Sequence, residues 1–266
     1  MFDTPVIWAF LACVAAALAT VVGGLVVLAG QKSNPRLLAF GLAFAGGAMV
    51  YISLVEIFGK GLGAFAEVYA PDPAYIYTTL AFFGGVLLIA LLDRLVPNPH
   101  GGIDYHPDQS GQGGHDTHVA RIGVMAALAI TAHNFPEGMA TFFAMLDDPV
   151  VGGPLAAAIA LHNIPEGVSI AIPIYYATGS KGKALLATFG SALAEPVGAL
   201  IGYAVLAPFL TDVVYGIVFA MIAGAMVFLA IDELLPTAKR YAKGHETTYG
   251  MVLGMGMIAL SLILLR

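Results

Sequence analysis

Eight long apolar stretches, separated by short polar segments, dominate this sequence. A helix that crosses the bilayer core needs roughly 20 mostly apolar residues, because each residue adds about 1.5 Å of rise. Hydrophobic residues make up 59% of the chain and charged residues 11%, whereas soluble domains carry about 25% charged residues. A soluble fold of 266 residues cannot bury so much apolar surface. The sequence therefore predicts an all-α membrane protein, a single transmembrane domain over residues 1–266 with eight spanning helices.

Turn-forming residues mark the breaks between these stretches. The clearest clusters are QKSNP at 31–35, PDP at 71–73, DDP at 147–149 and ATGSK at 177–181. The spans expected on this basis are 5–29, 36–59, 74–95, 120–146, 151–176, 184–207, 213–235 and 248–265.

The positive charges predict the orientation of the chain. Cytoplasmic loops of membrane proteins are enriched in Lys and Arg. Only Lys60 and Arg266 fall on one side of the expected bundle. We therefore expect a multi-pass protein of the cell (inner) membrane with both termini on the periplasmic or extracellular side. The nine positive residues of the opposite, cytoplasmic loops are Lys32, Arg36, Arg94, Arg121, Lys181, Lys183, Lys239, Arg240 and Lys243.

The segment 97–119, between the third and fourth spans, differs in composition from the other loops. It is rich in Gly and His and contains His100, His106, His115 and His118. We expect a flexible cytoplasmic loop, which is either a solvated linker or a loose metal-collecting arm. The spacing of its histidines matches no closed zinc site.

A repeated polar motif interrupts the fourth and fifth spans. HNFPEG at 133–138 and HNIPEG at 162–167 are offset by 29 residues, and Glu195 lies 29 residues beyond Glu166. Successive helices run antiparallel, so a constant interval keeps equivalent residues at one depth only near the bilayer midplane. Carboxylates there cost roughly 2.5–3.5 kcal/mol each, and no Lys or Arg lies at mid-span. These carboxylates therefore require cations or protons.

The spacing within each motif is typical of a metal site. His and Glu are four residues apart and Asn and Glu three apart, so the three side chains share one helical face. Imidazole nitrogen with amide and carboxylate oxygen suits zinc, iron, manganese, cobalt or cadmium. Pro136 and Pro165 would each free a backbone carbonyl within the membrane. The candidate metal ligands are His133, Asn134, Glu137, His162, Asn163, Glu166 and Glu195.

The doubled motif in two adjacent spans resembles the ZIP (Zrt/Irt-like protein) family of divalent metal transporters. The resemblance covers essentially the whole chain and also includes DELLP at 232–236. It implies a ZIP-type bundle with a two-metal site between the fourth and fifth spans, supplemented by the sixth. In that family pattern Glu137 and Glu166 bridge the two metals. The first metal position would use His133, Glu137, His162 and Glu166, and the second Asn134, Glu137, Asn163, Glu166 and Glu195.

Two residues of the second span are further candidates along the ion pathway. Met49 resembles a thioether that lines the site in some members of the family. Glu56 lies near the expected outer end of its helix. It is either an entrance ligand or a carboxylate that extends to the membrane surface.

We therefore expect a secondary transporter for uptake of divalent transition metals, zinc first, and no catalytic cofactor. The chain has no P-loop to bind ATP, and its net charge of −6 argues against nucleic-acid partners. Its expected partners are divalent metal ions and the lipid bilayer, and a homodimer is expected from the general behaviour of membrane transporters. Channel-like permeation and export remain open alternatives. An intramembrane metallohydrolase is a third, although HExxH is absent and Pro precedes each motif Glu.

Overall fold

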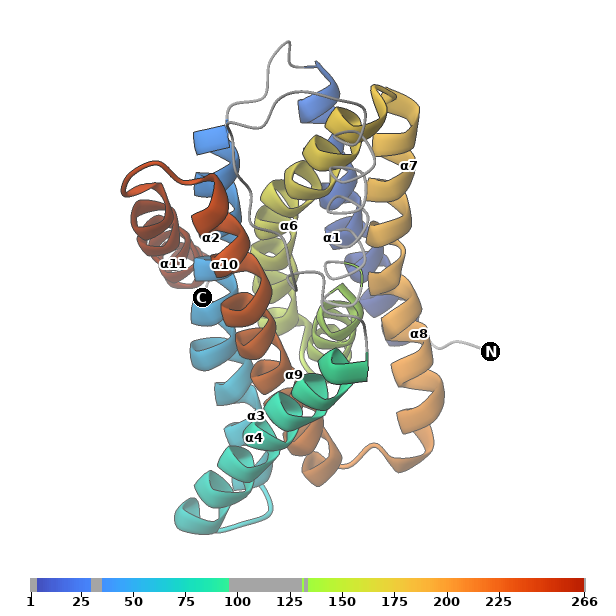
Figure 1. Ribbon diagram of the computed structural model, residues 1–266. Coiled ribbons are helices and arrows are strands. Elements are labelled where there is room, and N and C mark those ends of the chain that lie inside the picture. Colours follow the sequence, from blue (N-terminus) through green and yellow to red (C-terminus); the bar gives the residue numbers. More distant parts are fainter. Residues whose placement is uncertain (1–3, 30–34, 96–130, 132–133, 266) are drawn as a thin grey trace.

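The computed structural model describes residues 4–29, 35–95, 131 and 134–265, and every regular element in them is helical (Figure 1). The all-α prediction is therefore confirmed for this part of the chain. One helix covers residues 134–147. The other elements are α1 (Thr4–Ala29), α2 (Pro35–Ile52), η1 (Ser53–Ile57), α3 (Phe58–Ala66), α4 (Pro71–Leu95), α6 (Pro149–Thr178), α7 (Lys181–Ala192), α8 (Ala194–Leu206), η2 (Ala207–Phe209), α9 (Asp212–Leu229), η3 (Ala230–Leu234), α10 (Leu235–Tyr241) and α11 (Glu246–Leu265).

Seven helical stretches of the described chain are long and apolar enough to cross a membrane. They correspond to seven of the eight predicted spans. The remaining one, predicted over 120–146, is described only from residue 134 onward apart from residue 131, and there it is helical to residue 147. The His-rich segment 97–119 lies outside the described residues. The eighth crossing therefore stays a prediction.

Local side-chain chemistry explains where the fifth predicted span begins and ends. Asp148 accepts a hydrogen bond from the Val150 backbone N–H at 2.9 Å, and Pro149 follows it as the first helical residue. α6 ends at Thr178. The next residue, Gly179, has a φ of 62°, a left-handed conformation that favours glycine. Ser180 then caps α7 by accepting from the Lys183 N–H at 3.3 Å. The predicted breaks at 147–149 and 177–181 are thus confirmed.

Proline accounts for two helix irregularities that the sequence analysis did not predict. A proline ring clashes with the carbonyl four residues earlier. Before Pro236 the helix widens into the π-helical turn η3 and continues to Tyr241, whereas the predicted span ends at 235. Before Pro196 the helix is interrupted at Leu193, so the span predicted over 184–207 is one membrane-crossing stretch, Lys181–Phe209, in which α7 and α8 follow one another.

The second span is also longer than predicted. It was expected to end at residue 59, but it continues through the π-helical turn η1 and α3 to Ala66. A π turn holds one extra residue, so the helix proceeds past it with only a local widening. This extension places Glu56 inside the helix and away from its end.

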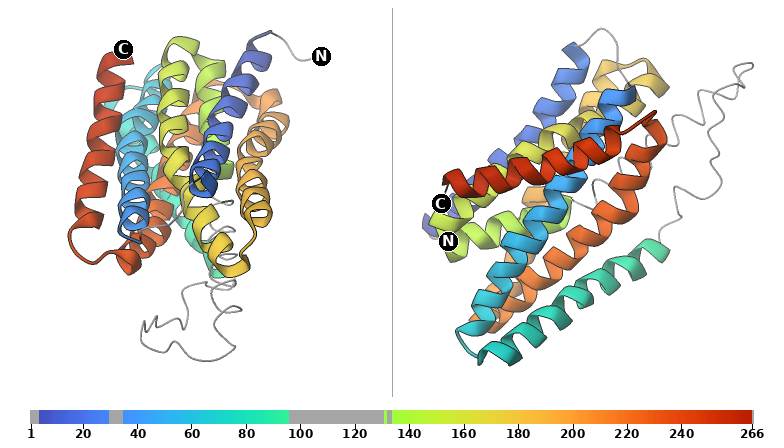
Figure 2. Two further views of the ribbon diagram at one scale, coloured as in Figure 1. Left: turned by 90° about the horizontal axis from the view of Figure 1, so that it is seen from above. Right: turned by 90° about the vertical axis from the view of Figure 1, so that its left-hand side faces the viewer.

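The helices form two groups that lie side by side (Figures 1 and 2). In the first group α1 packs mainly on α6 and also contacts α7 and α8, and the helix 134–147 lies against α8. In the second group α2 packs on α11, and α9 packs on α3 and α4. The principal contact between the groups is that of α2 with α6.

Glycines bring the main helix pairs into backbone contact. A Cβ added to Gly167 of α6 would lie 1.8 Å from the Thr20 carbonyl oxygen of α1, and one added to Gly23 would lie 2.0 Å from that of Ile164. Such small residues let membrane helices approach closely. The same reciprocal arrangement joins α2 to α11 through Gly47 and Gly254, α4 to α9 through Gly85 and Gly224, and the helix 134–147 to α8 through Gly138 and Gly198.

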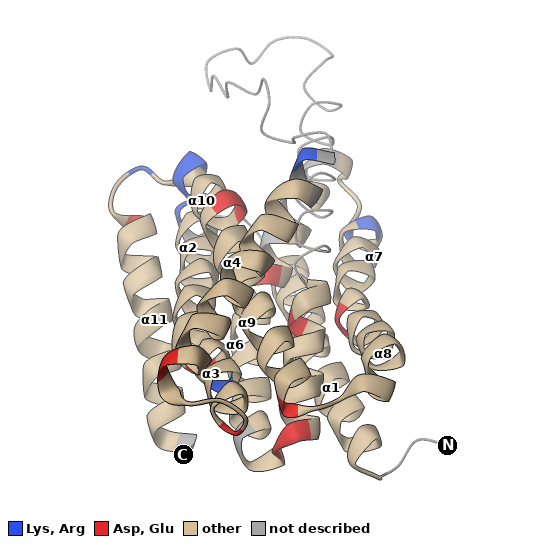
Figure 3. Cartoon of the chain, turned by 90° about the horizontal axis from the view of Figure 1, so that it is seen from below, with Lys and Arg blue, Asp and Glu red and all other residues tan. Residues whose placement is uncertain are grey.

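Most described positive charges lie at one end of the bundle (Figure 3). The start of α1 and the end of α11 lie at the opposite end, where Lys60 is found. We call the lysine-rich end the basic end. The positive residues at the basic end are Arg36, Arg94, Lys181, Lys183, Lys239, Arg240 and Lys243.

Candidate metal centre

The candidate ligands that the structure describes are all buried and all lie in the first helix group. They come from three elements, the helix 134–147, α6 and α8, which meet inside that group. His133 lies outside the described residues. The buried candidates, each with 0 or 1% of its surface exposed, are Asn134, Glu137, His162, Asn163, Glu166 and Glu195.

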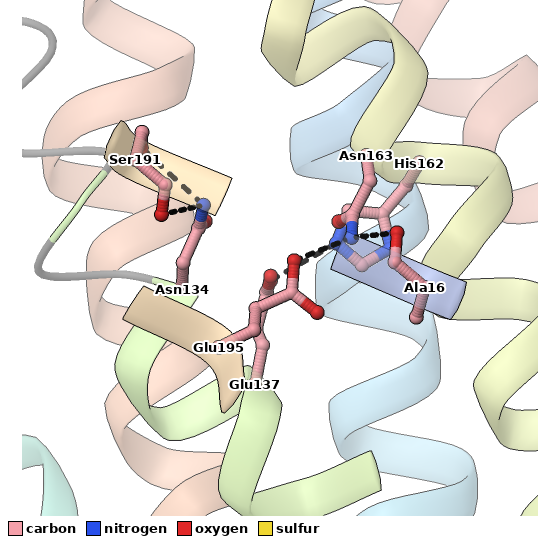
Figure 4. A network of polar contacts seen from close by, with 7 residues as sticks. All are labelled: Ala16, Asn134, Glu137, His162, Asn163, Ser191 and Glu195. Atoms are coloured by element: carbon pink, nitrogen blue, oxygen red, sulfur yellow. Dashed lines mark hydrogen bonds and ion pairs between the residues drawn. The ribbon is translucent and has the colours of Figure 1, made fainter. Parts of the chain in front are cut away.

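Three of these residues converge on one point. His162 and Glu166 are one turn apart on α6, so both side chains leave the same face of that helix. Glu137 reaches them from the helix 134–147, and its Oε1 lies 2.9 Å from Nε2 of His162 (Figure 4). One ligand atom from each of the three residues lies within 4.8 Å of the other two. One nitrogen and several carboxylate oxygens at such separations can surround a divalent ion such as zinc.

Asn163 connects this cluster to α8. Its side-chain amide donates to Oε1 of Glu195 at 2.7 Å and to the Ala16 carbonyl oxygen of α1 at 3.0 Å. Figure 4 shows the Glu195 and Glu137 side chains next to each other. Because both amide hydrogens are used, the amide is held with its Oδ1 turned away from these two acceptors. Oδ1 has no hydrogen-bond partner among the described residues, so it can serve as a ligand.

Asn134 has a different position from its counterpart in the second motif. Its amide donates to the carbonyl oxygen and the hydroxyl oxygen of Ser191 on α7, at 3.1 and 3.3 Å. Figure 4 shows this amide directed at Ser191 and away from the pair formed by His162 and Glu137. The two motifs are therefore equivalent in sequence but not in the contacts that their asparagines make.

Backbone packing sets the position of Glu195. A Cβ on Gly138, the residue after Glu137, would lie 1.9 Å from the Glu195 carbonyl oxygen. One turn along α8, a Cβ on Gly198 would lie 2.3 Å from the Phe135 carbonyl oxygen. The motif glycine thus lets the carboxylates of Glu137 and Glu195 come from two backbones in direct contact.

The electrostatics of the cluster favour cations. Glu137, Glu166 and Glu195 are acids in one buried region, and each charged carboxylate in a membrane interior costs roughly 2.5–3.5 kcal/mol. Every Lys and Arg that the structure describes lies toward one of the two ends of the bundle (Figure 3). No described Lys or Arg is therefore placed beside these acids, and a bound divalent ion would neutralise them.

Comparison with known proteins identifies the family. The family model described as ZIP zinc transporter matches residues 94–262. The chain belongs to the ZIP family. This confirms the family predicted from the doubled motif, and the ZIP match covers the fourth to seventh predicted spans in full.

Several bacterial ZIP proteins align with nearly the whole chain. A protein named zinc transporter ZupT from Stenotrophomonas maltophilia (strain K279a) is 55% identical over 261 residues, which cover 98% of this chain and 97% of that protein. The protein of the same name from Neisseria meningitidis serogroup C is 60% identical over 256 residues, 96% of this chain and 95% of that protein. The one from Lysinibacillus sphaericus is 46% identical over 268 residues, 99% of both chains.

The two additional candidates of this ZIP protein lie in the second helix group. Met49 is fully buried in α2. Glu56 is 5% exposed within η1, so a carboxylate that extends to the membrane surface does not fit its position. π turns in helices occur frequently at functional sites. Participation of either residue in metal transfer stays a prediction.

Sequence reasoning did not identify two contributors to the ZIP centre. Ser191 holds Asn134, and its position four residues before Glu195 was a usable signal. The Ala16 carbonyl oxygen holds Asn163. An alanine in an apolar stretch carries no sign of this role, because any residue type supplies the same backbone oxygen.

Proposed function

We propose that this ZIP protein is a secondary transporter that carries divalent transition-metal ions, zinc first, into the cytoplasm. The observation that carries the proposal is the buried convergence of Glu137, His162 and Glu166, whose ligand atoms lie within 4.8 Å of one another. Relatives that share 55–60% of their residues with this chain are named zinc transporters. The donor set of nitrogen and oxygen also suits iron, manganese, cobalt and cadmium.

The proposed centre holds two metal ions. Glu137, His162 and Glu166, together with His133, form the first position. Glu195 and Oδ1 of Asn163 form the second, with Asn134 as a further ligand once its amide turns from Ser191. Glu137 and Glu166 belong to both positions, because each carboxylate has two oxygens. The bond from Asn163 to Glu195 supports this division, since it aligns both side chains beside Glu137.

Binding and release follow from the same groups. The imidazole Nε2 of His162 coordinates metal only when it carries no proton. An arriving ion therefore takes the place of the proton between His162 and Glu137 and releases it. Apart from the two imidazoles, the ligands are oxygens, which hold zinc less tightly than thiolates do. Binding that is favourable but escapable is what passage requires.

The membrane potential supplies a driving force for uptake. A divalent cation that moves inward across 100 mV gains about 4.6 kcal/mol, which is twice about 2.3 kcal/mol for a single charge. We place the basic end in the cytoplasm and both chain termini on the periplasmic or extracellular side of the cell (inner) membrane, because Lys and Arg are enriched in cytoplasmic loops. The predicted homodimer stays a prediction.

Reconstitution in liposomes tests the proposal. The measurement is zinc entry, read by a fluorescent indicator inside the vesicles, for the wild type, Glu166→Gln and Glu67→Gln. Glu166→Gln preserves the side-chain volume and removes the charge, so zinc entry should fall at least tenfold. Glu67 is exposed after the end of α3, so Glu67→Gln should transport like the wild type. Unchanged zinc entry with Glu166→Gln would refute the proposed centre.

The same vesicles separate the alternatives. A carrier exchanges external for internal zinc, so preloaded metal should accelerate the entry of labelled zinc, whereas a channel shows no such acceleration. Export would be indicated if zinc moved only away from the side of the membrane on which the basic end lies. Cleavage of a peptide without metal flux would assign the protein to the metallohydrolases.

A further inference from the structure

A groove at the basic end has both charged and apolar walls. It lies between α10 and the first turns of α11 and has a volume of about 780 Å³. Lys239 and Lys243 line its charged part. Its apolar part includes Ile231, Leu235 and Val252. None of the candidate metal ligands that the structure describes borders it.

The two lysines lack counter-ions in the part of the chain that the structure describes, where neither forms a salt bridge. The acid nearest to Lys243 along the sequence, Glu246, is engaged elsewhere: it accepts from the Gly244 N–H at 2.6 Å and lies 3.5 Å from Nε of Arg36. The groove therefore presents two positive charges at a membrane interface. It also contains Thr247, whose buried Oγ1 has no hydrogen-bond partner among the described residues.

The apolar wall faces the lipid. Ile231 and Val252 line the groove and are 56% and 60% exposed. Apolar residues this exposed on a membrane helix bundle contact the acyl chains of lipids. The groove thus leads from the hydrocarbon region to the two lysines. A ligand that fills it needs an apolar chain at one end and a negative charge at the other.

We propose that this groove binds an anionic phospholipid. The phosphate would lie between Lys239 and Lys243, and an acyl chain would follow Ile231 and Val252. Basic pockets between membrane helices on the cytoplasmic side bind anionic headgroups in this way. A zwitterionic lipid brings its own cation and leaves the lysines uncompensated, whereas free phosphate cannot use the apolar wall. The proposal is independent of the metal centre.

Lipid titration followed by native mass spectrometry tests this site. Detergent-purified protein is titrated with phosphatidylglycerol or phosphatidylcholine, and bound lipids are counted. Wild type should retain phosphatidylglycerol preferentially. Each lysine near anionic lipid contributes about a fivefold factor in affinity, so Lys239→Gln with Lys243→Gln should weaken binding about thirtyfold. The matched control is Lys183→Gln with Arg240→Gln, which removes two exposed charges from the same end outside the groove and should bind like the wild type.

Several outcomes would overturn the proposal. Equal retention of the two lipids by the wild type would remove the charge selectivity. An equal loss in the control variant would indicate diffuse attraction to the basic end. Displacement of the lipid by glycerol phosphate at the same concentration would indicate an anion site without a role for the apolar wall. If the double variant does not fold, Lys239→Gln and Lys243→Gln are measured singly, and a loss well below fivefold in both refutes the site.

Discussion

Nε2 of His162 lies 2.9 Å from Oε1 of Glu137 on a neighbouring helix, and both side chains are fully buried. The contact joins the two copies of the repeated motif, since Glu137 belongs to the first and His162 to the second. It also places a nitrogen and an oxygen ligand where one metal ion can bind both. The pair is therefore the most direct place to test the centre.

Replacing His162 with Ala should lower zinc affinity by at least about 10–100-fold. At other metal sites, a loss of this size follows the removal of a residue that only hydrogen-bonds to a metal ligand. Isothermal titration calorimetry on purified protein measures the affinity. His245, exposed before the start of α11, provides the control: His245→Ala should bind zinc like the wild type. Equal affinities for His162→Ala and the wild type would remove His162 from the ligand set.

Zinc uptake should decrease as the external pH is lowered. Protons and metal ions compete for the imidazole nitrogen and the carboxylate oxygens, so metal affinity falls as proton concentration rises. The expected sign is a higher half-saturating zinc concentration at lower pH, measured in liposomes at constant membrane potential. A half-saturating concentration that is independent of pH would contradict coordination by Nε2 of His162.

Replacing Asn163 with Ala should affect the second metal position more than the first. The substitution removes the donor to Glu195 and to the Ala16 carbonyl oxygen, but it leaves Glu137, His162 and Glu166 in place. Bound zinc, counted by inductively coupled plasma mass spectrometry, should fall from two ions per chain to one. A stoichiometry of two would show that Asn163 is dispensable for the second ion.

Replacing Gly138 with Ala should destabilise the protein and reduce uptake. The new Cβ would lie 1.9 Å from the Glu195 carbonyl oxygen, so α8 must move, at the cost of about 1–3 kcal/mol typical of overpacking. Gly153 of α6 has open space around its Cβ position, and Gly153→Ala should stabilise by up to about 1 kcal/mol. Thermal unfolding in detergent compares the two. A Gly138→Ala variant as stable as the wild type would contradict this packing.

Much of the fold was predictable because transmembrane helices follow from composition. Long apolar runs between polar breaks identified seven stretches that the structure describes as helices long enough to span. Boundaries near prolines were harder to predict. The helix is interrupted at Leu193 before Pro196, whereas α6 continues past Pro165 without interruption. The same ring clash is therefore accommodated differently in the two places.

The candidate centre was predictable in its residues but not in its contacts. The spacing of His162 and Glu166 places both on one face of any helix. The equivalent spacing in the first motif did not indicate that Asn134 would donate to Ser191 while Asn163 donates to Glu195. Those contacts depend on the helix that lies opposite each asparagine, which the repeated motif does not encode.

The sequence by itself determined that this protein is a bundle of membrane helices with acids, imidazole and amides in its interior. The length of an apolar stretch and the spacing of side chains along one helix are local properties, so they can be read directly from the sequence. Only the tertiary structure decided that Glu137 meets His162 and that Glu195 meets Asn163. Around these contacts, Gly138 lies against the backbone of α8 and Gly167 against that of α1. The choice of neighbour is set by the packing of the whole bundle, because the spacing of residues along one helix does not specify which helix lies opposite.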